Sequence, residues 1–510
     1  MKSTQNRTGM DALRLAVFAA IACTAGSALA TSAPVPPAAG ATFPATPPAP
    51  GPAPTLQLPT PATHTLANGL QVISVRRAGL PLVTAQLVVR SGGEMDPAKL
   101  AGLADLTAVL LTRGAAGRSA PQIADAAETL GGSLSADAGW DQSAVSLTVT
   151  TPRLPQALVL LASVVRQPDF SAAELKRAKT QAIDDVRLEL SQPTALASLA
   201  ASRSVFGAGA YGHARSGTPT SIARIRRADV QHLHDALYRP DNAILILAGD
   251  ITPAQALALA QSSFGDWRKP EKALPPRPSG AAVGSLPALL MIDQRGAGQA
   301  GVVAAHAAPP RADADYYAGA VANAVLGGSY SARLNEEIRI KRGLSYGARS
   351  DLQPRRDAGV WLASAQTKNP SAPQVVDLLL GEFQRLGSTP VDDTELAARK
   401  ATMIGAYGRS LETTAGLAAR IAALAVYGIP LAEIGGYVAH VQAVTPQQVA
   451  RYATAHLGAD GVKVVVVGDA SQFGPTMRKA HPQAQRLEST SLDLDSPTLQ
   501  PRAATAHPQK

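Results

Sequence analysis

Between residues 70 and 150, short segments of the chain alternate apolar and polar positions. Leu70 to Val75, Val83 to Arg90 and Ala144 to Thr150 each follow the two-residue period of a half-buried strand. Longer segments between residues 121 and 190 place apolar side chains three and four positions apart, which predicts helices. Strands followed by helices are typical of an α+β domain, in which helices flank an antiparallel sheet.

A further helix is predicted directly after Asp96-Pro97. An Asp at the N-cap and a Pro in the first turn favour a helix start, and Gly114 marks the end of the apolar period. The second half of the chain repeats the same order, with a strand near Val302–Ala307 and a helix from Ala312 to Leu326. Each half is therefore expected to carry its own sheet and helices.

The two halves also resemble each other in sequence. The segment VQHLHDALYRPDNAILILAGD, which begins at Val230, aligns without gaps with VARYATAHLGADGVKVVVVGD, which begins at Val449. Both segments read as a helix, a turn, a short apolar strand and a final Gly-Asp. At nearly the same offset, Lys179 aligns with Lys400. The pattern indicates two tandem homologous α+β domains that arose by duplication.

Composition changes mark the ends of these domains. An uncharged segment with eleven prolines precedes the first half, a second Pro-rich segment separates the halves, and a polar, aperiodic segment ends the chain. The predicted organisation is a signal peptide over 1–30, a Pro-rich linker over 31–61, an N-terminal domain over 62–268, an interdomain linker over 269–287, a C-terminal domain over 288–477 and a disordered tail over 478–510.

The N-terminus has the features of a secretory signal. Basic residues precede an apolar stretch from Leu15 to Cys23, and Ala28-Leu29-Ala30 forms an A-x-A cleavage pattern. The apolar stretch is too short to span a bilayer, and no run of 18 apolar residues follows it. We therefore expect a periplasmic protein without a transmembrane span. The alternative is lipidation of Cys23.

Composition excludes several classes of function. The chain has one Cys, so a disulfide framework and a thiolate zinc site are ruled out. Aromatic residues make up only 4% of the chain, which argues against stacking on single-stranded nucleic acid. The formal net charge of +9 is modest for 510 residues. We expect no nucleic-acid partner.

Five landmarks in this order connect the chain with a known family: Asn68-Gly69-Leu70, Gly102-Leu103-Ala104, Gly131-Gly132, Tyr238 to Asn242, and Arg339 to Tyr346. With them the chain resembles pitrilysin/insulinase-type zinc metallopeptidases of the small bacterial and mitochondrial-processing kind. The resemblance implies two α+β halves that form a clam-like chamber around an unfolded peptide. It also implies an inverted zinc motif, H-x-x-E-H, on the first long helix.

The matching positions of this chain do not carry that motif. Asp105 stands at the first His, Ala108 at the catalytic Glu and Val109 at the second His. Val has no donor atom, and Ala cannot accept a proton. An acidic residue, Asp185, remains in the region of the distal ligand, but two carboxylates without a base fall short of a catalytic zinc site. The sequence therefore predicts no metal in this chain.

The second half keeps another part of the apparatus. In the family, an Arg and a Tyr seven residues apart reach across the chamber, and Arg339 and Tyr346 match this spacing and its Gly-Leu-x-Tyr context. The resemblance implies that they orient substrate and stabilise the oxyanion in trans. An Arg presents several fixed donors to peptide carbonyls, and a Tyr hydroxyl can donate to a developing oxyanion.

The resemblance thus implies a zinc-free subunit of a heterodimeric metallopeptidase, inactive alone and active with a partner that bears H-x-x-E-H and the zinc ion. Such a subunit would bind unfolded peptide, and Ala144 to Thr150 would offer a sheet edge for the peptide to extend. Two alternatives stay open. The first alternative is a structural scaffold of a larger assembly with no role in proteolysis. The second is an enzyme with an unusual metal site at Asp105 and Asp185.

Overall fold

The computed structural model describes residues 60–280, 282, 284–458 and 460–500. The predicted signal peptide and nearly all of the predicted Pro-rich linker lie outside these residues. The described residues belong to one compact unit. In this part of the chain, no helix combines the length and apolar composition needed to cross a bilayer.

The first half contains a six-stranded sheet with the order β1-β2-β8-β3-β7-β6. Its strands are β1 (Ala62–Thr65), β2 (Gln71–Arg76), β3 (Leu82–Val89), β6 (Ser135–Ala138), β7 (Ser143–Thr150) and β8 (Ala243–Gly249). A small hairpin, β4 (Gly114–Ala115) and β5 (Arg118–Ser119), lies apart from the sheet. The helices are α2 (Leu103–Leu111), α3 (Ala120–Thr129), α4 (Leu154–Arg166), α5 (Ala172–Leu190), α6 (Pro193–Phe206), α7 (Pro219–Arg224), α8 (Arg227–Leu237) and α9 (Pro253–Phe264).

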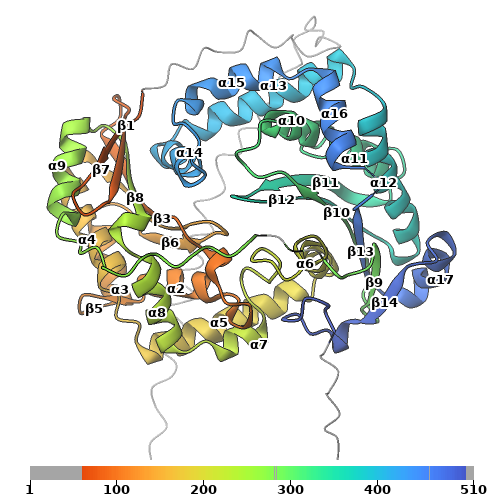
Figure 1. Cartoon of the computed structure of the whole chain (residues 1–510), viewed down its shortest axis with the longest axis horizontal. Coiled ribbons are helices and arrows are strands. Elements are labelled where there is room, and N and C mark those ends of the chain that lie inside the picture. Colours follow the sequence, from red (N-terminus) through yellow and green to blue (C-terminus); the bar gives the residue numbers. More distant parts are fainter. Residues whose placement is uncertain (1–59, 281, 283, 459, 501–510) are drawn as a thin grey trace, which may run out of the picture. The chain divides into compact units, whose positions relative to one another are not determined.

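The second half contains another six-stranded sheet, with the order β11-β12-β10-β13-β9-β14. Its strands are β9 (Leu289–Asp293), β10 (Ala300–Ala308), β11 (Ser345–Pro354), β12 (Gly359–Thr367), β13 (Lys463–Gly468) and β14 (Gln485–Glu488). The helices are α10 (Tyr316–Leu326), α11 (Arg333–Asn335), α12 (Ala372–Ser388), α13 (Asp393–Ser410), α14 (Thr414–Val426), α15 (Glu433–Ala443), α16 (Pro446–His456) and α17 (Ala470–Ala480). Figure 1 shows the two sheets and their helices.

The sheet topology confirms the predicted α+β class and bears the mark of a duplication. Without their outermost strands β1 and β14, the sheets read β2-β8-β3-β7-β6 and β9-β13-β10-β12-β11, which is the same order of equivalent strands. Among these equivalent strands each sheet has one parallel pair, β2 with β8 and β9 with β13. The two aligned lysines also make equivalent hydrogen bonds. Lys179 donates to the carbonyls of Ala223 and Ile225, and Lys400 donates to those of Gln442 and Val444.

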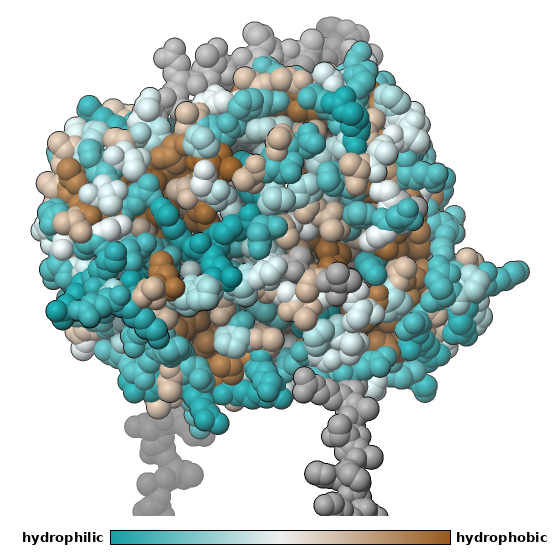
Figure 2. All heavy atoms as spheres, viewed as in Figure 1, coloured by the Kyte–Doolittle hydropathy of each residue, from teal (hydrophilic) through white to brown (hydrophobic). Residues whose placement is uncertain are grey.

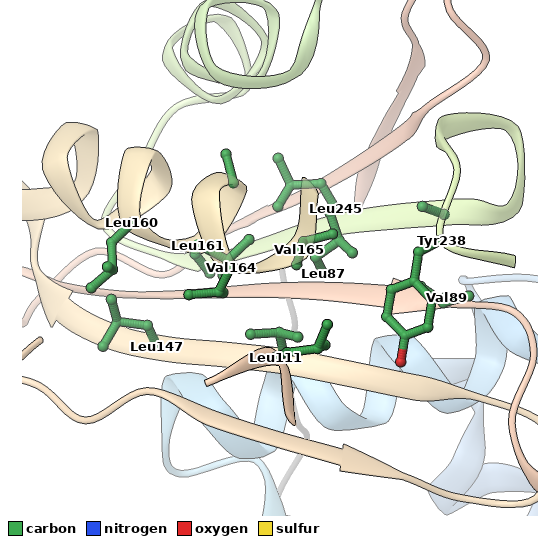
Figure 3. Close-up of a cluster of buried hydrophobic side chains, with 14 of the residues drawn as sticks. Leu87, Val89, Leu111, Leu147, Leu160, Leu161, Val164, Val165, Tyr238 and Leu245 are labelled. Carbon is green, nitrogen blue, oxygen red and sulfur yellow. The ribbon is translucent and has the colours of Figure 1, made fainter. Parts of the chain in front are cut away.

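One face of the first sheet is covered by helices of its own half. Leu87, Val89, Leu147 and Leu245 of the strands share a buried cluster with residues of α2 and α4, and Figure 3 shows Leu87, Leu147 and Leu245 beside side chains of α4. All of them are buried, and burying a side chain of this size stabilises a fold by about 1.5–3 kcal/mol. Figure 2 shows that hydrophilic residues cover most of the visible surface, with hydrophobic residues in smaller patches between them.

The opposite faces of the sheets are covered by exchanged helices. α6 of the first half packs on β10, β12 and β13 of the second sheet, whereas α14 of the second half packs on β3 and β8 of the first sheet. Leu417 and Ile421 of α14 share a buried cluster with Ile246 and other residues of the first sheet. Small residues of α6, such as Ala197 and Ala201, pack against Val303 and its neighbours. Neither half completes its core alone.

A buried polar contact also joins the halves. The guanidinium of Arg356 lies 3.1 Å from a carboxylate oxygen of Glu94 and 3.5 Å from one of Asp141, both in the first half. Burial, followed by the charge of Asp141, raises the pKa of Glu94 to about 7, although Arg356 acts in the opposite direction. Glu94 is therefore half-protonated near neutral pH.

The predicted disordered tail over 478–510 is wrong for the described part of that segment. β14 pairs in parallel with β9, and Leu499 is buried. Asp495 accepts a hydrogen bond from Thr218 at 2.7 Å and forms an ion pair with Arg224 at 3.1 Å. Apolar residues are too sparse here to give a periodic pattern, and their packing partners come from distant elements such as α6.

Truncation of a side chain in the exchanged helix tests the dependence of one half on the other. Leu417→Ala should lower the free energy of unfolding by about 2–5 kcal/mol, because Leu417 is buried against the first sheet. Leu188→Ala on α5 is the matched control, since Leu188 is 69% exposed, and should change it by less than about 0.5 kcal/mol. Urea unfolding followed by circular dichroism and by Trp fluorescence measures both. Equal changes in the free energy of unfolding for the two variants would show that the packing of α14 on the first sheet does not stabilise the fold.

The raised pKa of Glu94 predicts a pH dependence of stability. A carboxyl with a raised pKa in the folded state contributes stability at pH below its unfolded value near 4.5, and this contribution is lost as the pH rises through about 7. Relative to Glu94→Gln, the wild type should therefore lose on the order of 3 kcal/mol between pH 4.5 and pH 8. Unfolding titrations of both proteins across this range test it. Parallel pH profiles would show that Glu94 titrates normally.

Candidate peptide groove and degenerate metal site

The helix that carries the degenerate zinc motif starts later than predicted. α2 begins at Leu103, so Asp96 is not its N-cap residue. The Asp96 carboxylate instead accepts hydrogen bonds from the backbone N–H groups of Gly102 and Ala104, both at 2.9 Å. Asp96 thus caps the helix from the preceding turn. The sequence correctly predicted Asp96 as a capping residue, but it placed the start of the helix too early in the chain.

Asp105, at the first ligand position, is held by an arginine. Nη1 of Arg215 lies 2.7 Å and 3.0 Å from the two carboxylate oxygens of Asp105 and also donates to the carbonyl of Ala138 at 2.6 Å. Burial raises the pKa of Asp105, and the charge of Arg215 opposes this shift. A fixed cation therefore engages the side chain that stands at a metal-ligand position.

The other two positions offer no ligand chemistry. Ala108 is buried in a small cluster with Ala104 and Ala138. Val109 is partly exposed and lines a cavity of about 290 Å³ together with Asp185, which accepts a hydrogen bond from Gln181 at 2.8 Å. Within the described ranges, no group of three or more His, Cys, Asp or Glu side chains is placed to hold a metal ion. The residues present do not fit a zinc ion.

Arg339 and Tyr346 do not share one cavity. Arg339 lies on a π-helical turn, Glu336–Ile340, and its guanidinium sits 4.7 Å from the ring centroid of Tyr330. It lines a groove of about 1000 Å³. Tyr346 lies at the start of β11, next to a register shift between Ser345 and Ala348, and is 88% exposed. Its side chain is not among the described residues that line the groove.

The groove connects the two halves of the described chain. Its first section lies between the loop Gly327–Tyr330, strands β11 and β12, and the start of α6. A second section of about 520 Å³ continues to Arg215 and Glu189 in the first half. The two sections share five lining residues, namely Thr194, Ser198, Arg349, Gln353 and Leu362.

Sequence reasoning missed two residues of this region. Arg215 is 110 positions from Asp105, and Arg349 lies outside the matched Arg/Tyr spacing. Neither stands in a motif, so no local signal marks them. The predicted sheet edge was also misplaced. The strand over Ala144 to Thr150 is β7, which lies between β3 and β6, and the edge strands of this sheet are β6 and β1.

Comparison with known proteins gives the family. Residues 71–207 match the family model described as insulinase (peptidase family M16), and residues 224–403 match the model described as peptidase M16 inactive domain. The chain belongs to the insulinase family of peptidases. The resemblance inferred from the five landmarks is thereby confirmed at the level of the family.

Relatives and solved structures agree with this assignment. An uncharacterized zinc protease of Mycobacterium leprae is 26% identical over 332 residues, which cover 64% of this chain and 74% of the relative. The crystal structure of a peptidase M16 inactive domain from Pseudomonas fluorescens has a TM-score of 0.74 at 28% sequence identity. The matched region covers 80% of this chain and 98% of the Pseudomonas fluorescens chain. A protease from Helicobacter pylori shares the fold, with a TM-score of 0.76 at 19% identity and coverages of 81% and 100%.

Restoration of the motif should not restore a strong zinc site. The triple variant Asp105→His, Ala108→Glu and Val109→His places a Glu among buried alanines and leaves the Arg215 cation beside the new ligands. We expect weak zinc binding at most and little hydrolysis. Addition of Arg215→Ser to the triple variant should strengthen zinc binding about 10–100-fold, in the range of outer-shell effects.

Elemental analysis after dialysis and a zinc titration measure both variants, with the unmodified chain as control. Retention of one zinc per chain by the triple variant, together with peptide hydrolysis, would contradict this account of the site.

Proposed function

We propose that this chain is a zinc-free subunit of a heterodimeric periplasmic metallopeptidase of the insulinase family. The observation that carries the proposal is the contrast between its two halves. The metal helix has lost its ligands, and Arg215 neutralises Asp105, whereas Arg339 lines an open groove. Such a chain binds and orients unfolded peptide, and the zinc ion and the catalytic Glu belong to a homologous partner.

Arg339 and Tyr346 have different tasks under this proposal. The planar guanidinium of Arg339 offers several donors to the carbonyls of a peptide in the groove. Tyr346 projects from the surface, where its hydroxyl is free to reach a partner's site and donate to a developing oxyanion. The high exposure of Tyr346 is expected of a residue that acts in trans.

A second candidate function is a scaffold subunit without a role in proteolysis. Two observations favour it. Arg339 stacks on the ring of Tyr330, and the side chain of Tyr346 does not line the groove. In a scaffold, both residues would only pack or interact with solvent. The two functions differ in what removal of these side chains does to turnover.

In the assembled complex, Arg339→Ala and Tyr346→Phe should each lower turnover and leave assembly intact. Loss of one oxyanion donor typically costs about 10²–10³ in rate, and Tyr346→Phe removes only the hydroxyl. The matched controls are Arg478→Ala on α17 and Tyr316→Phe on α10, which do not line the groove. Both controls should keep the wild-type rate.

The measurement is peptide cleavage by each complex with an H-x-x-E-H-bearing family member, after size-exclusion chromatography has established complex formation. Wild-type rates in both site variants would favour the scaffold function. A complex that forms only without these substitutions would assign the pair to assembly.

A further inference from the structure

The floor of the groove is a polar part of a sheet face. In the register of β11 with β12, Arg349 lies opposite Ser364 and Asp351 opposite Leu362. Side chains alternate between the two faces of a strand, so residues 349, 351 and 353 share one face with 362 and 364. All of these side chains line the groove.

The same sheet face is apolar where α6 covers it. Val303, Val360 and Val465 are buried in a cluster with Ala197 and other residues of α6. α6 packs on β10, β12 and β13, and Thr194 and Ser198 near its start form a wall of the groove. The open part of the face therefore begins where the helix ends its cover, and it carries polar side chains toward the cavity.

The cations of the groove outnumber its available anions. Arg339 and Arg349 line the first section, and neither forms an ion pair with any described carboxylate. The carboxylate that lines this section, Asp351, already accepts a hydrogen bond from Gln353 at 2.7 Å. In the second section, Arg215 is already paired with Asp105, which leaves Arg349 and Arg355 with the single carboxylate of Glu189.

Backbone pairing is partly blocked along this floor. β11 is an edge strand, but the N–H of Ala348 donates to the Asn335 side chain and that of Ser350 donates to the carbonyl of Gly327, both at 3.2 Å. A peptide cannot pair with β11 at Ala348 and Ser350 unless it first breaks these two hydrogen bonds. Recognition here falls to side chains, of which the free guanidinium groups are the strongest donors.

We propose that this groove selects extended peptides that carry acidic side chains, with Arg349 as the residue that sets the preference. The inference rests on the proposed function, because it assumes that the groove binds peptide. Arg349 lines both sections, so one substitution there reaches the whole length of the site.

The test uses three unstructured, fluorescently labelled peptides that are identical except for Asp, Ser or Lys at the same positions. Anisotropy titrations with the full chain should show the Asp peptide binding about five- to tenfold more tightly than the Ser peptide, as expected for two exposed charge pairs, and the Lys peptide most weakly. The Asp preference should shrink at high ionic strength.

Two charge-reversal variants locate the effect. Arg349→Glu should abolish or invert the ratio of Asp to Ser affinity, whereas Arg478→Glu makes the same change in net charge on α17 and should preserve it. Thermal melts followed by circular dichroism verify that both variants fold. Retention of the Asp preference by Arg349→Glu would overturn the role of Arg349.

The outcomes distinguish a failure of the acidic preference from a failure of the proposed function. Equal affinity of the wild type for all three peptides overturns the acidic preference and leaves peptide binding intact. A ratio that Arg478→Glu lowers as much as Arg349→Glu also overturns it, since net charge alone would then explain the preference. Absence of binding to all three peptides overturns both the preference and the proposed function.

Discussion

The exchange of α6 and α14 is the contact on which the rest of this structure depends. Each sheet has one face covered by its own helices and the other by a helix from the opposite half. The apolar face of either sheet would be exposed to water without its exchanged helix, at a cost of about 25 cal/mol per Å². The exchange therefore fixes both halves within one compact unit. It also forms the groove, since the start of α6 is one of its walls.

At the position of the zinc motif, the described residues satisfy one another without a metal ligand set. A carboxylate such as Asp105, largely buried, needs a compensating cation, and Arg215 supplies it together with a hydrogen bond to the edge strand at Ala138. Ala108 fills the adjoining space with a small apolar side chain. The helix packs in the core of the first half, and its polar side chain Asp105 is paired with Arg215.

Charge is distributed unevenly between the two ends of the groove. Near α2 the arginine is paired, whereas near β11 the arginines have no carboxylate partner among the described residues. Unpaired guanidinium groups on an open polar surface are available to a ligand, and paired ones are not. Under the proposed function, the second half of the chain would therefore contribute more to peptide binding than the first half.

The sequence by itself determined the α+β class, the duplication and the family. Period-two and period-3.6 patterns are local, and the alignment of Lys179 with Lys400 marks two equivalent places that the structure shows to be equivalent in hydrogen bonding. It also shows that Asp105, Ala108 and Val109 stand where the resemblance places the His, Glu and His of the zinc motif. Only the tertiary structure decided the pairing of Asp105 with Arg215, the order of β6 and β7, the packing of the tail around Leu499 and the exposure of Arg349 in the groove. These features depend on contacts between residues far apart in the chain, which no local periodicity or spacing encodes.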